Sequence, residues 1–79
     1  MNAKQKKTLV MIFEKPTRSD ISWQETVLLL LRIGAVMKEG KGSRVRFKCR
    51  DCSLHVHAPH PENVILKGTV EVIRGFLTD

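Results

Sequence analysis

The chain has 79 residues, and its 14 lysines and arginines outnumber its eight aspartates and glutamates to give a formal net charge of +6. This length fits one small domain and leaves no room for a separate cofactor domain or a large substrate cavity. The excess of positive charge instead indicates a polyanionic partner, which could be nucleic acid, an acidic protein or an anionic membrane.

Neither apolar run in the first half of the chain resembles a targeting or membrane segment. Residues 9–13 are too few for a signal peptide, and residues 27–31 fall far short of the ~20 residues that cross a bilayer. We therefore expect a soluble, cytoplasmic protein with no membrane partner. Cys49 and Cys52 stand too close together to staple a fold, and a reducing compartment would keep both as thiols.

The N-terminal segment predicts a loose tail followed by a short helix. Residues 1–7 are basic and lie at the chain's end, where mobility is common. The helix that follows has Leu9, Ile12 and Phe13 on one face and ends before Pro16, which disfavours helical geometry in the preceding residue.

A second helix is predicted from Ser22, which begins a Ser-x-x-Glu capping box, to a terminator at Gly34. It is apolar on nearly every side, so we expect it to be the central element of the core. Its core stripe is predicted at Trp23, Val27, Leu30 and Leu31. Leu28 and Leu29 could lie off this stripe and contact a partner, although ordinary burial also explains them.

From Ala35 onward the apolar residues recur with a period of two, which is typical of strands. A short strand begins at Val36 and Met37, and residues 39–42 supply a turn. The next two predicted strands are separated by a turn at residues 50–51. Their apolar positions are Val45, Phe47 and Cys49, then Leu54, Val56 and Ala58.

The last predicted helix begins at Thr69, with Val70, Ile73 and Leu77 on its core side. The element order is therefore α-α-β-β-β-α. This order predicts one α+β domain over residues 1–79, in which helices pack on one face of a three-stranded antiparallel sheet.

The opposite face of this sheet should carry basic and titratable side chains, because successive strand residues point to opposite sides. These are Arg44, Arg46, Lys48, His55 and His57. Alternating charges are often no more than the solvated face of a sheet. Here, however, no acidic residue stands among the five, which favours phosphate binding.

Three short motifs, in this order and spacing over residues 22–78, resemble the HicA family of toxin–antitoxin ribonucleases. They are Gly42-Ser43 opening a basic strand, Pro59-His60-Pro61, and Lys67-Gly68-Thr69 opening the last helix. The resemblance implies a fold like that of the double-stranded-RNA-binding domain and cleavage of messenger RNA without a cofactor or metal. It also implies a HicB-like antitoxin partner that covers the active face.

The chain departs from the family at one position. The family usually carries its catalytic histidine directly after Gly-Ser or one residue later, and these positions are Arg44 and Val45 here. Neither side chain is a general base at neutral pH. The chain is therefore a catalytically altered branch, a relative that only binds RNA, or an enzyme whose base comes from elsewhere.

Metal-free RNA cleavage needs proton transfer and stabilisation of a charged phosphorane, which suit histidine and arginine respectively. We expect His57 to be the leading general acid or base and His55 the second choice, with Arg44 or Arg46 as the phosphate clamp. Further phosphate contacts are expected from Lys48, Ser43 and Lys67, the last because free N–H groups at a helix start attract phosphate. His60 is a lesser candidate, and ordinary solvent-facing or structural roles also explain all three histidines.

A zinc site is the competing interpretation. Cys49-x-x-Cys52 followed by His55, His57 and His60 supplies zinc-ligand types, although strand alternation turns Cys49 inward and His55 and His57 outward. Three functions therefore remain open: a ribonuclease toxin, a non-catalytic RNA-binding module, and a zinc-stabilised interaction domain. A DNA-binding repressor is less attractive because no predicted helix is both exposed and basic.

Overall fold

The computed structural model describes residues 1–59 and 62–78, which form three helices and one antiparallel sheet. The elements follow the order α1 (Ala3–Phe13), α2 (Trp23–Arg32), β1 (Val36–Glu39), β2 (Arg44–Cys49), β3 (Cys52–His57) and α3 (Lys67–Thr78). The strands lie in the spatial order β1-β2-β3. This confirms the predicted α+β class and the order of its elements.

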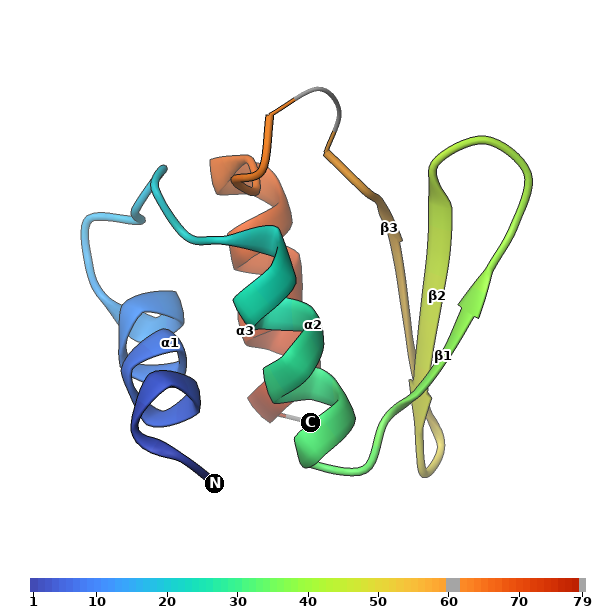
Figure 1. The fold of residues 1–79 in the computed structure, drawn as a ribbon, viewed down its shortest axis with the longest axis horizontal. Helices are drawn as coiled ribbons and strands as arrows, with labels where there is room; N and C mark the ends of the chain where they lie inside the picture. The colour runs from blue at the N-terminus through green and yellow to red at the C-terminus, as the bar shows by residue number, and fades with distance from the viewer. Residues whose placement is uncertain (60–61, 79) are drawn as a thin grey trace.

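The molecule has a layered arrangement, with all helices on one side of the sheet (Figure 1). α2 and α3 lie next to the sheet, and α1 packs against them on the side away from it. The buried core joins the three layers, with Ile12 from α1, Leu30 from α2, Phe47 from β2 and Ile73 from α3 all at 0% exposure. No helix within residues 1–59 and 62–78 combines the length and apolarity needed to cross a bilayer.

α1 begins earlier than predicted, and the loose tail expected at residues 1–7 is wrong for residues 3–7. Asn2 caps the helix: its side chain accepts the Gln5 backbone N–H at 2.8 Å, and the Gln5 side chain accepts the Asn2 N–H at 3.1 Å. Thr8 is buried one turn later and donates its hydroxyl to the Lys4 carbonyl. The reciprocal cap and this buried turn extend the helix through the basic residues.

α2 has the predicted ends, and Trp23, Val27 and Leu30 belong to the core as predicted, but Leu31 does not. Ser22 accepts the Glu25 backbone N–H at 3.2 Å, and Gly34, with φ of 103°, follows the helix. Ala35 N–H bonds to the Leu30 carbonyl and Gly34 N–H to the Leu31 carbonyl, which is the Schellman pattern. The buried apolar residues are Leu29 and Leu30, whereas Leu28 and Leu31 are exposed. Leu31 was therefore wrongly assigned to the core, and Leu29 is not available to a partner.

The connection between α1 and α2 is held by two arginines. Arg74 of α3 donates to the Ile12 carbonyl at 3.0 Å, and to the Glu14 carbonyl and the Thr17 hydroxyl at 3.2 and 3.3 Å. Arg18 bonds both Glu14 and Asp20, and its hydrogen bond lowers the pKa of the Asp20 carboxyl below its ordinary value. These contacts fix α1 against α3.

We predict that Arg74→Met lowers the free energy of unfolding by about 2 kcal/mol, because the Ile12 and Glu14 carbonyls at the end of α1 lose a charged donor. Methionine keeps most of the aliphatic packing, so the loss reports the hydrogen bonds. Urea unfolding measures it. The control is Arg32→Met, at the exposed end of α2; an equal loss in both variants would show that Arg74 does not hold α1 in place.

Candidate functional site

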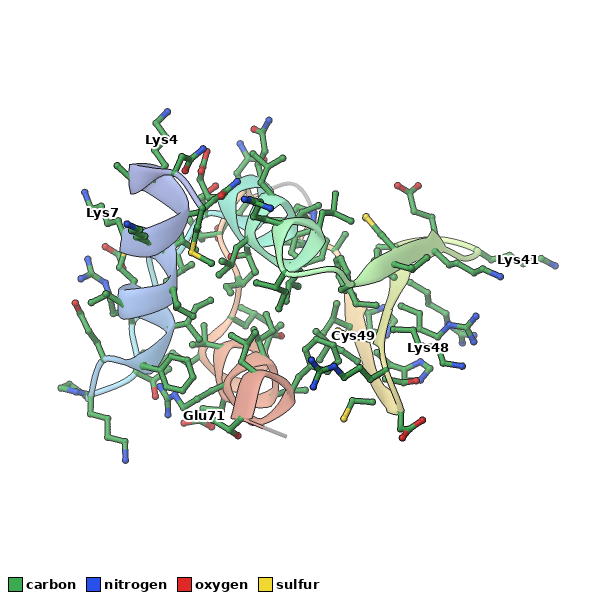
Figure 2. The ribbon with its side chains drawn as sticks, turned by 90° about the horizontal axis from the view of Figure 1, so that it is seen from below. Lys4, Lys7, Lys41, Lys48, Cys49 and Glu71 are labelled. Atoms are coloured by element: carbon green, nitrogen blue, oxygen red, sulfur yellow. The ribbon has the colours of Figure 1, made fainter. Side chains whose placement is uncertain are left out.

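The sheet buries one face under the helices and leaves the other uncovered. Along β2, Val45 and Phe47 are buried while Arg44, Arg46 and Lys48 are exposed; along β3, Leu54 and Val56 are buried while His55 and His57 are exposed. Figure 2 shows Lys48 directed away from the helices and Cys49 directed towards them. We call the uncovered side the outer face. Its basic and titratable residues are Lys38, Arg44, Arg46, Lys48, His55 and His57.

The register places each imidazole beside a guanidinium. Arg44 lies opposite His57 and Arg46 opposite His55. The Ala58 N–H donates to the Ser43 carbonyl at 2.7 Å, which makes residues 43 and 58 a hydrogen-bonded pair. Hydrogen-bonded and non-hydrogen-bonded pairs alternate along an antiparallel ladder. Both Arg–His pairs are therefore of the non-hydrogen-bonded kind, whose Cα atoms lie only ~4.5 Å apart and whose side chains are closer.

A tight hairpin fixes this register at the other end of the ladder. Cys49 and Cys52 are partners, so the connection has only two residues, Arg50 and Asp51. Arg50 has a φ of 57°, the left-handed conformation that short hairpin turns require. Because the turn sets the pairing, it also determines which cation faces which imidazole.

Lys38 belongs to the outer face although the sequence interpretation did not include it. β1 pairs with β2 so that Lys38 lies opposite Arg46, which in turn lies opposite His55. The three form one row across the sheet. The signal was present in the sequence, because Met37 faces the core beside Phe47 and its neighbour must then face outward.

Within residues 1–59 and 62–78 the cations of the outer face make no ion pair. Both ion pairs in this described part of the chain are made by Arg18, in the connection between α1 and α2. Glu39, the nearest acid along β1, lies opposite Val45 and so belongs to the other side of the sheet. The outer face is therefore a surface of uncompensated positive charge, which attracts polyanions.

Two expected phosphate contacts lie apart from this cluster. Ser43 directly precedes β2, and its carbonyl accepts the Ala58 N–H beyond the end of β3, so Ser43 does not lie on a strand with the arginines. Lys67 begins α3, on the side of the sheet that the helices cover (Figure 1). The structure therefore does not bring Lys67 together with the arginines. His60 lies outside the described residues.

The cysteines and the strand histidines face opposite sides of the sheet. Cys49 and Cys52 are free, partly buried, and line a small cavity with Ile33, Phe76 and Leu77 on the helix side. His55 and His57 are exposed on the outer face. Within the described part of the chain no group of three or more metal-ligating side chains gathers. These four residues therefore cannot ligate one ion.

We predict that zinc does not stabilise the fold, because a structural zinc site needs four converging ligands. In their cavity the two thiols have only apolar neighbours, apart from Arg50 of the turn. Thermal unfolding in EDTA should give the same Tm as unfolding with one equivalent of zinc. The double variant Cys49→Ser, Cys52→Ser serves as control. A rise in Tm with zinc that this variant abolishes would restore the zinc-stabilised interaction domain.

Comparisons with protein-family models, with curated proteins and with solved structures each found no match to this chain.

Proposed function

We propose that the protein is an endoribonuclease, the HicA-like toxin of a type II toxin–antitoxin pair, which binds and cleaves messenger RNA on its outer face. The observation that carries the proposal is the pairing of His57 with Arg44 and of His55 with Arg46 on the uncovered side of the sheet, where the described cations make no ion pair. A HicB-like antitoxin in the cytoplasm would silence it by covering that face.

The register offers a position for the base that this chain lacks after Gly42-Ser43. Arg44 stands directly after Gly42-Ser43, where the family usually has its histidine, and His57 is its cross-strand neighbour. An imidazole from β3 thus reaches the same part of the outer face as a side chain at position 44. This supports a catalytic centre whose base comes from the adjacent strand.

The proposed chemistry divides between imidazoles and guanidinium groups. One histidine takes the proton of a ribose 2′-OH as its oxygen attacks the phosphorus, and the other gives a proton to the departing 5′-oxygen. His55 and His57 are two residues apart on one strand face, about 7 Å along β3, a separation suited to flanking one phosphate. Arg44 and Arg46 stabilise the phosphorane with fork-shaped donors that match two oxygens.

RNA binding is the first step to test, and it should depend on salt. The double variant Arg44→Ala, Arg46→Ala should weaken binding of single-stranded RNA. It should also make the plot of log K against log salt less steep, by ~1 in slope for each phosphate that the variant no longer neutralises. Fluorescence anisotropy at several salt concentrations measures both.

The matched control for binding is Lys4→Ala, Lys7→Ala. It removes the same charge from α1, on the far side of the molecule from the sheet (Figure 2). If both double variants lose the same affinity and slope, binding depends on net charge alone and the outer face is not the RNA site.

Cleavage is tested on purified protein in EDTA, freed of any partner and of contaminating nuclease. We expect His57→Ala to lower the single-turnover cleavage rate by about 10²- to 10⁴-fold with little change in RNA affinity, because it removes a proton-transfer group. His55→Ala should have a smaller effect or remove one limb of the pH–rate profile. Undiminished cleavage by a folded His57→Ala protein would exclude the role given to His57.

A binding-only protein is the second candidate, and the presence of Arg44 and Val45 at the family's histidine positions favours it. Salt-sensitive RNA binding by wild-type protein, with no cleavage in the same assay, would select this candidate over the nuclease.

A further inference from the structure

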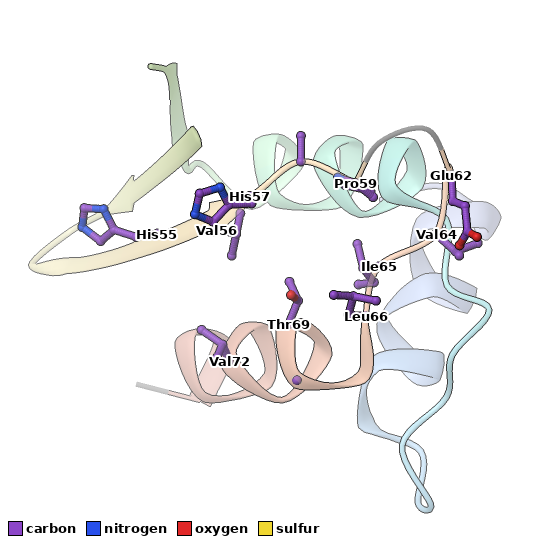
Figure 3. Close-up of a pocket in the computed structure, with 12 residues that line it drawn as sticks. His55, Val56, His57, Pro59, Glu62, Val64, Ile65, Leu66, Thr69 and Val72 are labelled. Carbon is purple, nitrogen blue, oxygen red and sulfur yellow. The ribbon is translucent and has the colours of Figure 1, made fainter. Parts of the chain in front are cut away.

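A groove runs between β3 and the first half of α3, bordered by residues 55–59 and by Glu62. Its volume is about 670 Å³. Figure 3 shows Val56, Thr69 and Val72 directed into the space between strand and helix, while His55 and His57 point the other way. The apolar residues of its lining include Val56, Ala58, Val64, Leu66 and Val72. Leu66 and Val72 are 74% and 53% exposed, so the structure leaves a sizeable apolar surface in contact with water.

The groove lies along an open sheet edge. Among residues 1–59 and 62–78, β3 pairs with β2 only and lies at the end of the strand order. Because residues 43 and 58 form a hydrogen-bonded pair, the ladder alternation gives the bonds between β2 and β3 to Leu54 and Val56. The backbone N–H and C=O groups of Ser53, His55 and His57 consequently face the open edge. An exposed row of this kind is a template for another strand.

We infer that this edge and groove bind an extended peptide segment in which acidic residues alternate with apolar ones. A strand added to β3 places its side chains alternately on the two sides of the sheet. On one side they enter the apolar groove beside Val56 and Val72. On the other side they lie next to His55 and His57, with Arg44 and Arg46 one strand further, about 10 Å away. Apolar and acidic side chains match these two surfaces.

This inference extends the partner part of the proposed function without depending on RNA cleavage. A segment bound in this way places carboxylates beside the imidazoles and the arginines, where the proposed site holds phosphate. It gives an inhibitory partner both a main-chain anchor and a charge match.

The probe is a fluorescent peptide of about nine residues, the length of an ordinary strand, with alternating glutamate and valine. Two control peptides are used, one with the same residues in two blocks and one with lysine in place of glutamate. We expect the alternating acidic peptide to bind about tenfold more tightly than either control. Equal binding of the block peptide would overturn the inference, because it would show attraction by charge or apolarity without strand register.

Two variants locate the peptide. Val72→Glu puts a carboxylate in the groove and should weaken peptide binding about tenfold, a change of ~1.4 kcal/mol. Val10→Glu is the matched control, on a similarly exposed helix position of α1. Ser53→Pro removes an edge-facing N–H while leaving the bonds between β2 and β3 intact, and it should also weaken binding. Equal affinity in Val72→Glu and Val10→Glu would overturn the groove as the site.

Amide hydrogen exchange gives a readout that needs no variant, since the amides of Ser53, His55 and His57 should become protected when the peptide binds. Unchanged exchange at these amides would contradict strand addition. RNA affinity is measured on the same Val72→Glu protein and should not change; a parallel loss would assign the groove to the RNA site. Peptide binding without RNA binding would refute the proposed function and keep this inference, and the reverse result would do the opposite.

Discussion

Burial of Phe47 determines where every side chain of β2 points. Its ring has no exposed surface and meets Trp23 of α2 edge-on, with centroids 6.3 Å apart. A shift of one residue would turn Phe47 to solvent and drive Arg44 and Arg46 under the helices. Burying unpaired guanidinium groups is far more costly than exposing one apolar side chain. The basic outer face therefore follows from the packing of the core.

The hairpin pairing makes the orientation of the β3 side chains follow from that of the β2 side chains. Leu54 lies opposite Phe47 and Val56 opposite Val45, so the two strands share their buried side. The two-residue turn excludes any other pairing, and His55 and His57 must emerge beside Arg46 and Arg44. Packing energy thus positions groups that contribute little to stability themselves.

The sequence predicts the structure best where the apolar residues keep one period and only one side of the element is buried. The alternation over residues 44–57 predicts both strands, their buried side and the outward histidines, because a period of two admits only two orientations. α2 is harder, since leucines occupy positions 28–31 and burial depends on the layer packed on each side. α1 covers α2 on the side away from the sheet, and the apolar pattern of α2 alone could not show which leucines this would bury.

The errors at residues 3–7 and at Lys67 also have local causes. Residues 3–7 look like a basic tail by composition, and only the reciprocal cap of Asn2 and Gln5 reveals the helix. Lys67 belongs to a motif of the resemblance, but a motif does not show on which side of the sheet its residues lie, and α3 lies on the side that carries the helices.

The register also bears on whether an altered motif is compatible with catalysis. Of the two positions where the family usually has its histidine, position 45 is turned into the core, with Val45 6% exposed, and only position 44 faces outward. A base at position 44 would occupy the same row of the sheet as His57. In this chain the cation, Arg44, lies on β2 and the imidazole, His57, lies on β3, so both groups belong to one cross-strand pair. Under the proposed function, the absence of histidine after Gly42-Ser43 is compatible with a nuclease, because the register brings the imidazole of His57 beside position 44.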